Sequence, residues 1–409
     1  MAVESRQALV RYARAAVGPI GGAGAQFVLA LVLLARLPAA GFGCFAFLMV
    51  VAQLGLGVWG ALFAAPLLVA AVQREGLGGL AVAALAAMVP AGVVIGAVAW
   101  VTGGDGWAAL AFGGFGALLL TRQVGRTWHL ATGRPARAMA SDLAYASVLL
   151  AGAAVLALAA GAGLRGAALA LVVAVAAGFA PLLEAGLAAR VARLRPRDLA
   201  GYGAVWRRDS RWSLLGVVTT ELTGNCHAYV VTGLAGAAAF APIAAAALLI
   251  RPVTVGVNAL TEFERAHFAR CFAAGDLAGA GRARGHLHAM LLALWGLTAV
   301  AAAGLMWCAP QVVFHGRYPL GLVGVGVGLW FGVALARSLH SPEGAILQAA
   351  GAFRPLAFIS VWTCGVSLVA VLGLVVLAGP VWSIGGIALG EACFAVALWR
   401  AASRWLAHG

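Results

Sequence analysis

The sequence predicts an all-α integral membrane protein with about twelve transmembrane helices in two lobes of six. Hydrophobic residues make up 63% of the 409 residues and charged residues only 10%, whereas a soluble domain is roughly half apolar and about a quarter charged. The apolar runs are continuous and about 20 residues long, which is the length at which a helix crosses a bilayer. Arginines gather in alternate connections between these runs. Together these observations exclude a soluble enzyme, a nucleic-acid-binding domain and a disordered chain.

Twelve apolar runs define the predicted spans. They cover Ala15–Ala35, Gly43–Val72, Leu77–Val101, Trp107–Leu130, Met139–Gly161, Gly166–Ala189, Trp212–Gly233, Ala239–Thr261, His286–Pro310, Leu320–Leu339, Pro355–Ala378 and Val381–Trp399. Only residues 73–76 separate the second span from the third.

The distribution of basic residues predicts the topology. All 27 basic residues are arginine, and the net charge is +14. In a soluble protein this balance would suggest nucleic acid, but in a membrane protein basic connections mark the cytoplasmic side. With the N-terminus inside, 23 arginines fall in inner segments, Arg36, Arg165 and Arg317 fall outside, and Arg251 stays within a span. We therefore expect both termini in the cytoplasm and no nucleic-acid partner.

The longest polar stretch, residues 190–211, divides the spans into two groups of six. Residues 1–198 are expected to form the N-terminal lobe with its cytoplasmic linker, and residues 199–409 the C-terminal lobe. Many transporters consist of two repeated halves that hold substrate near the bilayer midplane. The outer connections are short, as at residues 103–106 and 379–380, which argues against a membrane-embedded glycosyltransferase or polymerase.

The chain lacks the sequence signatures of common enzymes. It has no phosphate-binding loop, dinucleotide fingerprint or Ser/His/Asp constellation. None of its six cysteines forms a Cys-x-x-Cys pair. We therefore expect a protein that is not an enzyme and that needs no cofactor and no metal, so that a gradient or the consumption of product would drive transport.

Several short motifs are spread over nearly the whole chain. They are Ala35-Arg36-Leu37-Pro38 with Gly41-Phe42-Gly43, Gln53-Leu54-Gly55-Leu56-Gly57, Thr132-Gly133-Arg134-Pro135 between Arg122 and Asp142, Leu347–Pro355, and Gly385–Glu391. In these motifs the sequence resembles the O-antigen and exopolysaccharide flippase branch of the multidrug/oligosaccharidyl-lipid/polysaccharide exporter superfamily. The resemblance implies two six-helix lobes that form a V around a central cavity.

The resemblance also implies a function and a location. The expected activity is a flippase in the bacterial inner membrane. Its substrate would be an oligosaccharide linked to undecaprenyl diphosphate, moved from the cytoplasmic to the periplasmic leaflet for polysaccharide biosynthesis. Membrane lipids, a polysaccharide polymerase and glycosyltransferases of the same pathway are the expected partners.

The alternative within this superfamily is a cation-coupled multidrug exporter. Proton-coupled drug exporters of the superfamily usually keep an acidic residue in the first helix, whereas residues 15–35 contain none and carry Gln26 instead. This departure disfavours the exporter. Gln26 and Gln53 join the candidate substrate-binding residues.

Arg251 is the strongest candidate for a substrate-binding residue. It lies about 12 residues, or roughly 18 Å, into the eighth span. Charges at this depth are costly and usually face the protein interior or an aqueous cavity. Thr254 and Asn258 follow at i+3 and i+7, on the same helix face. The planar fork of an arginine suits phosphate oxygens, so this face is a candidate diphosphate site.

Acidic residues in the spans have two interpretations each. Glu221 lies roughly 14 Å into the seventh span with Asn225 on the same face. It could form a buried ion pair with Arg251 that fixes helix packing, or hold Arg251 while an anionic substrate is absent. Glu221 and Glu391 are also candidates for ion coupling, although Glu391 could merely bond to its neighbours. Glu343 is expected to cap or break a helix.

Arg122 and Arg126 lie one turn apart near the inner end of the fourth span. One interpretation is that their side chains extend to the membrane surface and anchor the helix. The other is a basic vestibule that gathers a diphosphate headgroup from the inner leaflet.

The topology generates the first prediction. Reporter enzymes fused after residue 105 and after residue 379 should be active in the periplasm, and a fusion near residue 200 should be active in the cytoplasm, because the arginine-rich segments stay inside. A periplasmic signal near residue 200 would overturn the arrangement of two six-span lobes.

Overall fold

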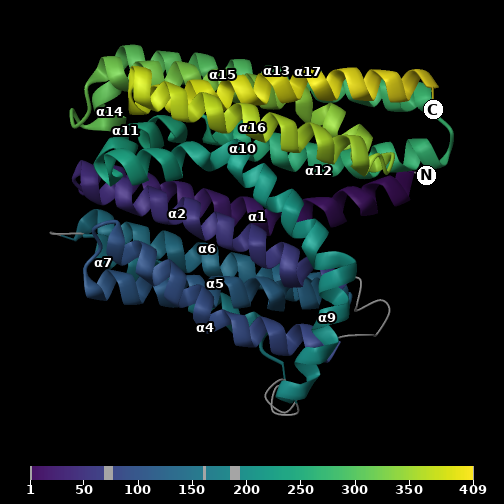
Figure 1. Ribbon diagram of the computed structural model, residues 1–409, viewed down its shortest axis with the longest axis horizontal. Helices are drawn as coiled ribbons and strands as arrows, with labels where there is room; N and C mark the ends of the chain where they lie inside the picture. The colour runs from purple at the N-terminus through teal and green to yellow at the C-terminus, as the bar shows by residue number, and fades with distance from the viewer. Residues whose placement is uncertain (1, 69–76, 160–162, 185–193, 409) are drawn as a thin grey trace. The chain divides into compact units, whose positions relative to one another are not determined.

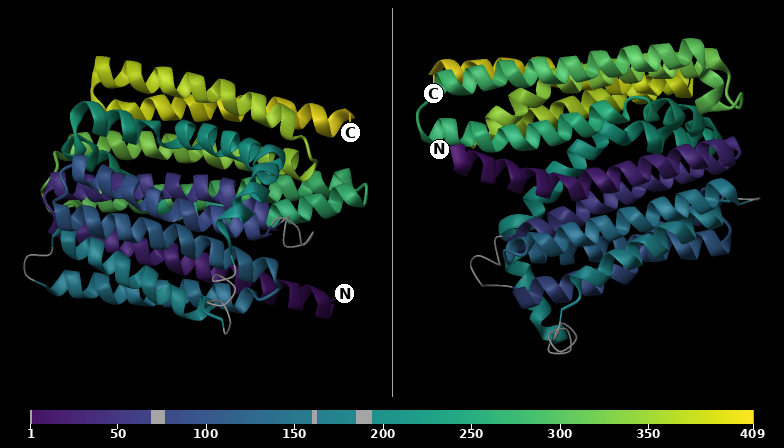
Figure 2. Two further views of the ribbon diagram at one scale, coloured as in Figure 1. Left: turned by 60° about the horizontal axis from the view of Figure 1, so that its bottom comes forward. Right: turned by 180° about the vertical axis from the view of Figure 1, so that it is seen from behind.

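The computed structural model describes residues 2–68, 77–159, 163–184 and 194–408, and in these ranges it contains helices and no β-strand. The chain divides into two compact units, Met1–Val218 and Thr219–Gly409. The sequence predicted the boundary between the lobes at residue 198. The observed division falls later in the chain, inside α10 (Arg211–Ala235). Each unit is a bundle in which the long helices run nearly side by side (Figure 1, Figure 2).

The first unit contains six predicted spans followed by a linker. Its elements are α1 (Ala2–Arg36), α2 (Ala39–Trp59) with the π-helical turn η1 (Gly60–Ala64), α4 (Leu77–Val101), α5 (Gly106–Ala131), α6 (Pro135–Leu158), α7 (Leu164–Phe179) with η2 (Ala180–Leu182), η3 (Pro196–Gly201), α9 (Tyr202–Val205) and η4 (Trp206–Ser210). Helix α6 packs on α1 and α7, and α5 packs on α4 and α7.

The second unit is organised around α15. Its elements are α10 (Arg211–Ala235), which begins in the first unit, α11 (Ala237–Leu248), α12 (Arg251–Ala273), α13 (Leu277–Cys308), α14 (Pro310–Phe314), α15 (Leu320–Ala349), α16 (Phe353–Ala378), η5 (Pro380–Trp382) and α17 (Ser383–His408). Helix α15 contacts α11, α12, α13, α16 and α17.

The predicted fold class is confirmed: the protein is an all-α integral membrane protein. Nine helices of the described ranges are long and apolar enough to cross a bilayer, and α11 with α12 would make a tenth. The other two predicted spans are also helical, in α1 and α10. Polar residues such as Glu221 and Asn225 make α10 less apolar than α11, the next helix along the chain.

Two predicted spans differ from the structure. The eighth is not one continuous helix, because α11 and α12 meet at a 61° bend around Leu249 and Ile250. The tenth does not end at Leu339, because α15 continues to Ala349 through Pro342. Glu343 therefore lies inside a helix, and the expectation that it caps or breaks one is wrong.

Two connections between helices, one in each unit, use a turn that glycine accommodates. Gly133 between α5 and α6 has φ = 73°, and Gly351 between α15 and α16 has φ = 72°. Side chains other than glycine rarely adopt this left-handed conformation. Each of these glycines shortly precedes an Arg-Pro pair, Arg134-Pro135 and Arg354-Pro355, so the corresponding connection of each unit is built alike.

The helices α4 and α5 approach each other through glycine. A Cβ placed on Gly113 would come within 2.8 Å of the carbonyl oxygen of Gly92, and one on Gly92 would come within 2.9 Å of that of Gly113. These neighbours are backbone atoms and cannot rotate away. Small residues permit such close packing between membrane helices.

The close contact generates a prediction with a matched control. Gly113→Ala should lower the free energy of unfolding by about 1–3 kcal/mol, the usual cost of overpacking. Gly114→Ala should be neutral or slightly stabilising, because a Cβ there meets no atom within 4 Å and alanine favours helix. Thermal unfolding of both variants in detergent measures the difference. Equal stability of the two variants would contradict the packing.

Candidate functional site

Two arginines of α5 converge on one aspartate of α6. Arg122 Nη2 lies 2.5 Å from Asp142 Oδ1, and Arg126 Nη2 lies 2.6 Å from Asp142 Oδ2. Residues 122 and 126 are one helical turn apart, so both side chains reach the same neighbouring helix. Arg122 and Asp142 are each only 6% exposed. The result is a buried cluster of two positive charges and one negative charge.

Arg122 makes further contacts with side chains of α6. Its Nε donates to Ser141 Oγ at 2.9 Å, and Ser141 Oγ in turn donates to the carbonyl oxygen of Gly178 at 2.6 Å. The guanidinium lies over the ring of Tyr145, 4.9 Å from its centroid. Gln26 Nε2 on α1 donates to Tyr145 Oη at 3.1 Å. Gln26 therefore contacts this cluster through Tyr145.

Glycines let α1 and α7 close over the cluster. A Cβ on Gly18 would lie 2.6 Å from Asp142 Oδ2, and one on Gly178 would lie 2.5 Å from Arg122 Nε. Neither position has room for a larger residue without moving the ion pairs. The cluster thus ties together four helices of the first unit.

Neither interpretation of Arg122 and Arg126 included these contacts. Both guanidinium groups are paired with Asp142, and the buried Arg122 is not part of an open basic vestibule. The pairing with Asp142 was missed, although Asp142 followed the Thr132–Pro135 motif in the sequence.

The second unit contains a comparable cluster around Glu391 of α17. Its Oε1 accepts a hydrogen bond from Arg337 Nε at 2.8 Å, and its Oε2 lies 2.8 Å from His340 Nε2. Glu391 is 5% exposed. Both its oxygens are thus bonded to neighbours on α15. The sequence analysis assigned Arg337 to the basic inner end of the tenth span and ended that span at Leu339, before His340, so neither residue was predicted to pair with Glu391.

Two further contacts surround α15. A Cβ on Gly224 of α10 would come 2.9 Å from Arg337 Nη2, so α10 passes directly beside this arginine. One helical turn beyond His340, Glu343 accepts two hydrogen bonds at one oxygen, from Arg284 Nε at 3.0 Å and from Arg284 Nη2 at 2.7 Å. Ion pairs therefore join α15 to α13 and to α17. Helix α10 lies against Arg337 of α15.

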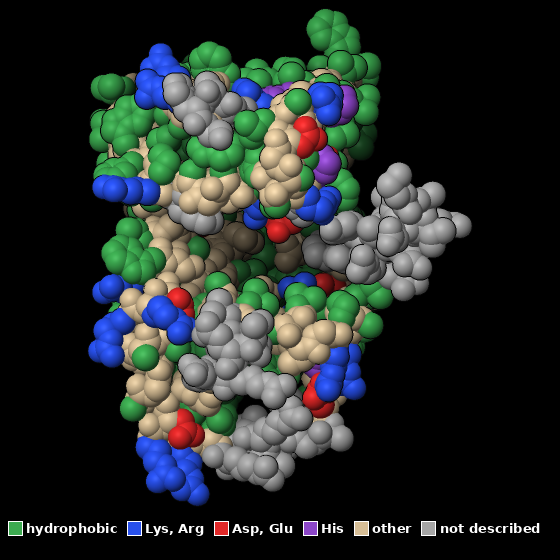
Figure 3. All heavy atoms as spheres, turned by 90° about the vertical axis from the view of Figure 1, so that its right-hand side faces the viewer, with side chains coloured by type: hydrophobic (Ala, Val, Ile, Leu, Met, Phe, Trp, Pro, Cys, Tyr) green, Lys and Arg blue, Asp and Glu red, His purple; other side chains and the backbone are tan. Residues whose placement is uncertain are grey.

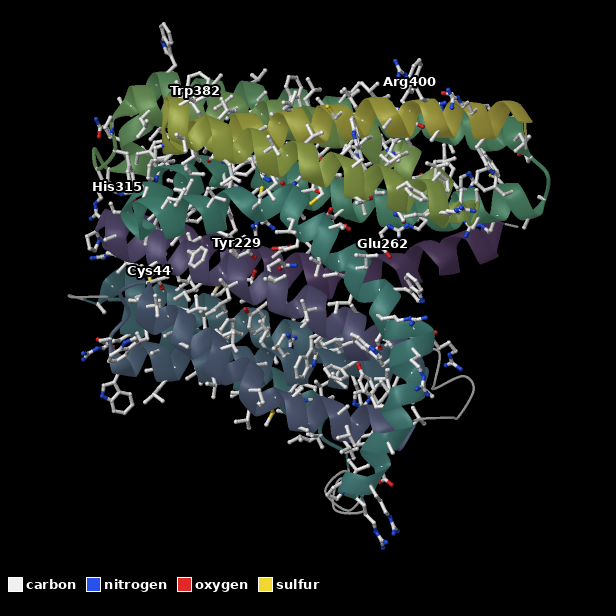
Figure 4. All side chains as sticks on the ribbon, in the orientation of Figure 1. Cys44, Tyr229, Glu262, His315, Trp382 and Arg400 are labelled. Atoms are coloured by element: carbon white, nitrogen blue, oxygen red, sulfur yellow. The ribbon has the colours of Figure 1, made fainter. Side chains whose placement is uncertain are left out.

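Glu221 has neutral partners on its own helix. Its Oε1 accepts hydrogen bonds from Asn225 Nδ2 at 2.9 Å and from Tyr229 Oη at 3.3 Å; Tyr229 is labelled in Figure 4. The expected common face of Glu221 and Asn225 is confirmed. The expected Glu221–Arg251 ion pair is not formed in the part of the chain that the structure describes.

Arg251 is the first residue of α12 and directly follows the bend. Its side chain is exposed and makes no ion pair or hydrogen bond with a described residue. Pro252 occupies the first turn, where its missing N–H costs nothing. Thr254 Oγ1 bonds back to the carbonyl oxygen of Ile250 at 3.3 Å, and Asn258 is exposed.

The last predicted candidate, Gln53, is exposed on α2.

Outside the spans, the N–H of Ala108 and the guanidinium of Arg165 lower the pKa of Asp105, the N-cap residue of α5. Within the described ranges there is no group of three His, Cys, Asp or Glu side chains that could hold a metal ion.

The helices and buried charge clusters define a class: multi-pass membrane proteins built from two helical bundles. Within that class the fold is similar to that of solved MATE transporter structures. Neither a protein-family model nor a curated protein matches the sequence.

Several solved structures are similar. A multidrug resistance MATE family transporter of the MOP superfamily, in an inward-facing conformation, matches with a TM-score of 0.67 and 13% identity over 94% of both chains. A MOP superfamily transporter from Pyrococcus furiosus matches with a TM-score of 0.60 and 16% identity over 97% of this chain and 95% of that one. A eukaryotic MATE transporter matches with a TM-score of 0.60 and 15% identity over 96% of both chains.

The cluster around Asp142 generates the third prediction. Asp142→Ala leaves the buried Arg122 and the partly buried Arg126 without a counter-charge and should lower the free energy of unfolding by about 3–5 kcal/mol. The control is Asp209→Ala, whose partner Arg208 is 53% exposed; such surface pairs contribute about 0–1 kcal/mol. Thermal unfolding in detergent compares them. An Asp142→Ala protein as stable as the control would show that the pairing is not structural.

Proposed function

We propose that this chain is a flippase that moves an oligosaccharide linked to polyprenyl diphosphate from the cytoplasmic to the periplasmic leaflet. The observation that carries the proposal is Arg251, an exposed guanidinium at a break within a membrane span that has no partner among the described residues. The MATE-like fold supports the coarser statement that the chain is a transporter.

Two features at the break favour an anion. The guanidinium carries a permanent positive charge and presents several donors that fit phosphate oxygens. The N-terminus of α12 also directs the positive end of the helix dipole to the same place. Broken membrane helices in transporters use such N-termini for anionic substrate groups. A diphosphate headgroup matches both features.

The carboxylates of the spans do not favour a cationic substrate. Three acidic side chains are buried in the described ranges, Asp142, Glu343 and Glu391, and each is paired with arginine. A cationic drug would therefore meet neutralised carboxylates there. The cost of exposing them again would include leaving buried guanidinium groups unpaired.

The second candidate function is a cation-coupled multidrug exporter. The structures with this fold include a multidrug resistance transporter, and Glu221 is half-buried with neutral donors rather than an arginine on its carboxylate. In that function Glu221 would carry the coupling ion or meet the drug. In the flippase, Glu221 keeps α10 polar beside the substrate path.

The proposed setting is the bacterial inner membrane with both termini in the cytoplasm. Glycosyltransferases would supply the lipid-linked repeat unit, and a polymerase would consume it on the other side. Consumption of the product would then give the transport its direction.

Substitution of Arg251 tests the flippase. In proteoliposomes loaded with a polyprenyl-diphosphate-linked oligosaccharide, Arg251→Ala should slow transfer about 10- to 100-fold, the equivalent of a lost charged hydrogen bond. Arg251→Lys should lose less, because it keeps the charge without the fork. Thermal stability should not fall in either variant. Arg270→Ala, an exposed arginine on the same helix, is the control and should transport normally. An Arg251→Ala protein with full transfer activity would refute the proposal.

Glu221 separates the two functions. Glu221→Gln keeps hydrogen bonding to Asn225 and Tyr229 and removes the charge, so a flippase that binds diphosphate at Arg251 should retain transfer. A cation-coupled exporter should lose ion-driven efflux of a fluorescent cationic drug. Drug efflux by the wild-type protein that this variant abolishes, without lipid transfer, would establish the exporter instead.

A further inference from the structure

The linker that precedes α10 is fastened to η1, the π-helical turn that follows α2, through one carbonyl group. Tyr202 Oη and Ser210 Oγ both donate to the carbonyl oxygen of Leu62, at 3.1 Å and 3.0 Å. An α-helical donor to this oxygen would be the N–H of residue 66, which is Pro66 and has none. Two hydroxyl groups of the linker bond to the carbonyl oxygen.

A second contact holds the linker on α4. A Cβ on Gly79 would come 2.8 Å from the backbone nitrogen of Tyr202 and 2.9 Å from the carbonyl oxygen of Asp198. The linker backbone thus lies directly against the start of α4, where Figure 1 shows α9. Both contacts join the linker to other elements of the first unit, so one face of the linker is turned toward that unit.

The π-helical turn η4 determines which residues point outward. In it the N–H of Arg211 bonds to the carbonyl oxygen of Trp206, an i to i+5 bond that accommodates one extra residue. Val205 and Ser210, five residues apart, are therefore both buried. The residues between them are turned outward, and Arg207 is among these exposed residues.

The outward face combines arginine and tryptophan. Trp206 and Trp212 are 38% and 62% exposed. Arg207 has no partner in the described ranges, and Arg211 lies over the ring of Trp212, 4.8 Å from its centroid. Arg208 is paired with Asp209 at 2.9 Å. Two guanidinium groups therefore remain available beside two indole rings.

We propose that this outward face of residues 206–212 binds an anionic phospholipid of the cytoplasmic leaflet. Indole rings settle at the headgroup level of a membrane, and arginines at that level attract anionic lipids. Arg207 and Arg211 would hold the phosphate, with Trp206 and Trp212 beside the glycerol and the upper acyl chains. Figure 3 shows arginine side chains on the face of the molecule turned toward the viewer.

The occupant is a bilayer phospholipid rather than the transported lipid. The proposal does not depend on the flippase function, because the face is argued from its own charge and exposure. Binding of a lipid here would hold the start of α10 at the membrane surface, and α10 carries Glu221 and Asn225 into the second unit.

The test measures lipid binding to the full-length protein in detergent. Native mass spectrometry with added phosphatidylglycerol or phosphatidylcholine should show preferential binding of the anionic lipid, weakening as ionic strength rises. Arg207→Gln with Arg211→Gln should weaken phosphatidylglycerol binding by about 10- to 30-fold, because a basic side chain at an anionic lipid contributes about fivefold. Arg207→Lys with Arg211→Lys should retain most of the binding.

The matched control is Arg270→Gln with Arg282→Gln, which removes two exposed arginines elsewhere on the predicted cytoplasmic side and should leave the affinity unchanged. Equal binding of the two lipids by the wild-type protein, or an equal loss in control and linker variants, would overturn the proposal. Displacement of phosphatidylglycerol by polyprenyl diphosphate at equal concentration would overturn it too, because the face would then serve the substrate.

Discussion

Pairing of buried carboxylates with arginine is the constraint on which both helical bundles depend. A charge inside a bilayer is costly and is kept where it has a counter-charge or water. In the first unit Asp142 compensates Arg122 and Arg126, and in the second Glu391 compensates Arg337. The glycines beside these groups follow from the pairing, because larger residues would displace the ions. Helix packing and charge pairing therefore cannot be varied independently.

Hydropathy and charge were sufficient to predict the helices, since length and apolarity alone decide which segments can cross a membrane. Both signals act locally along the chain. The partners of the buried charges were not predictable in this way, because Arg337 and Glu391 lie 54 residues apart and meet only after packing. The predicted tenth span also ended at Leu339, before the polar residues His340 and Ser341, although the helix continues to Ala349. Polar residues that indicate a loop in the sequence lie here within a helix of the bundle.

The bend before Arg251 had a sequence signal that was not used. A proline disrupts the helix on its N-terminal side and suits the first turn of a new helix, so Pro252 in the middle of an apolar run indicated a break. Recognition of that break changes the chemistry of Arg251. In a continuous helix the residue would need a neighbouring carboxylate, and Glu221 was the natural choice. At a helix start, two positive features coincide, and an anion from outside the protein is the complement.

The two clusters differ in the balance of their charges. Around Asp142 two guanidinium groups face one carboxylate, and arginine keeps its proton in proteins, so this cluster contains one more guanidinium than carboxylate. Around Glu391 one guanidinium and one imidazole each occupy one carboxylate oxygen, so guanidinium and carboxylate are matched in number. In both units the carboxylate has both its oxygens occupied by side chains of a neighbouring helix, and it therefore joins two helices of its bundle.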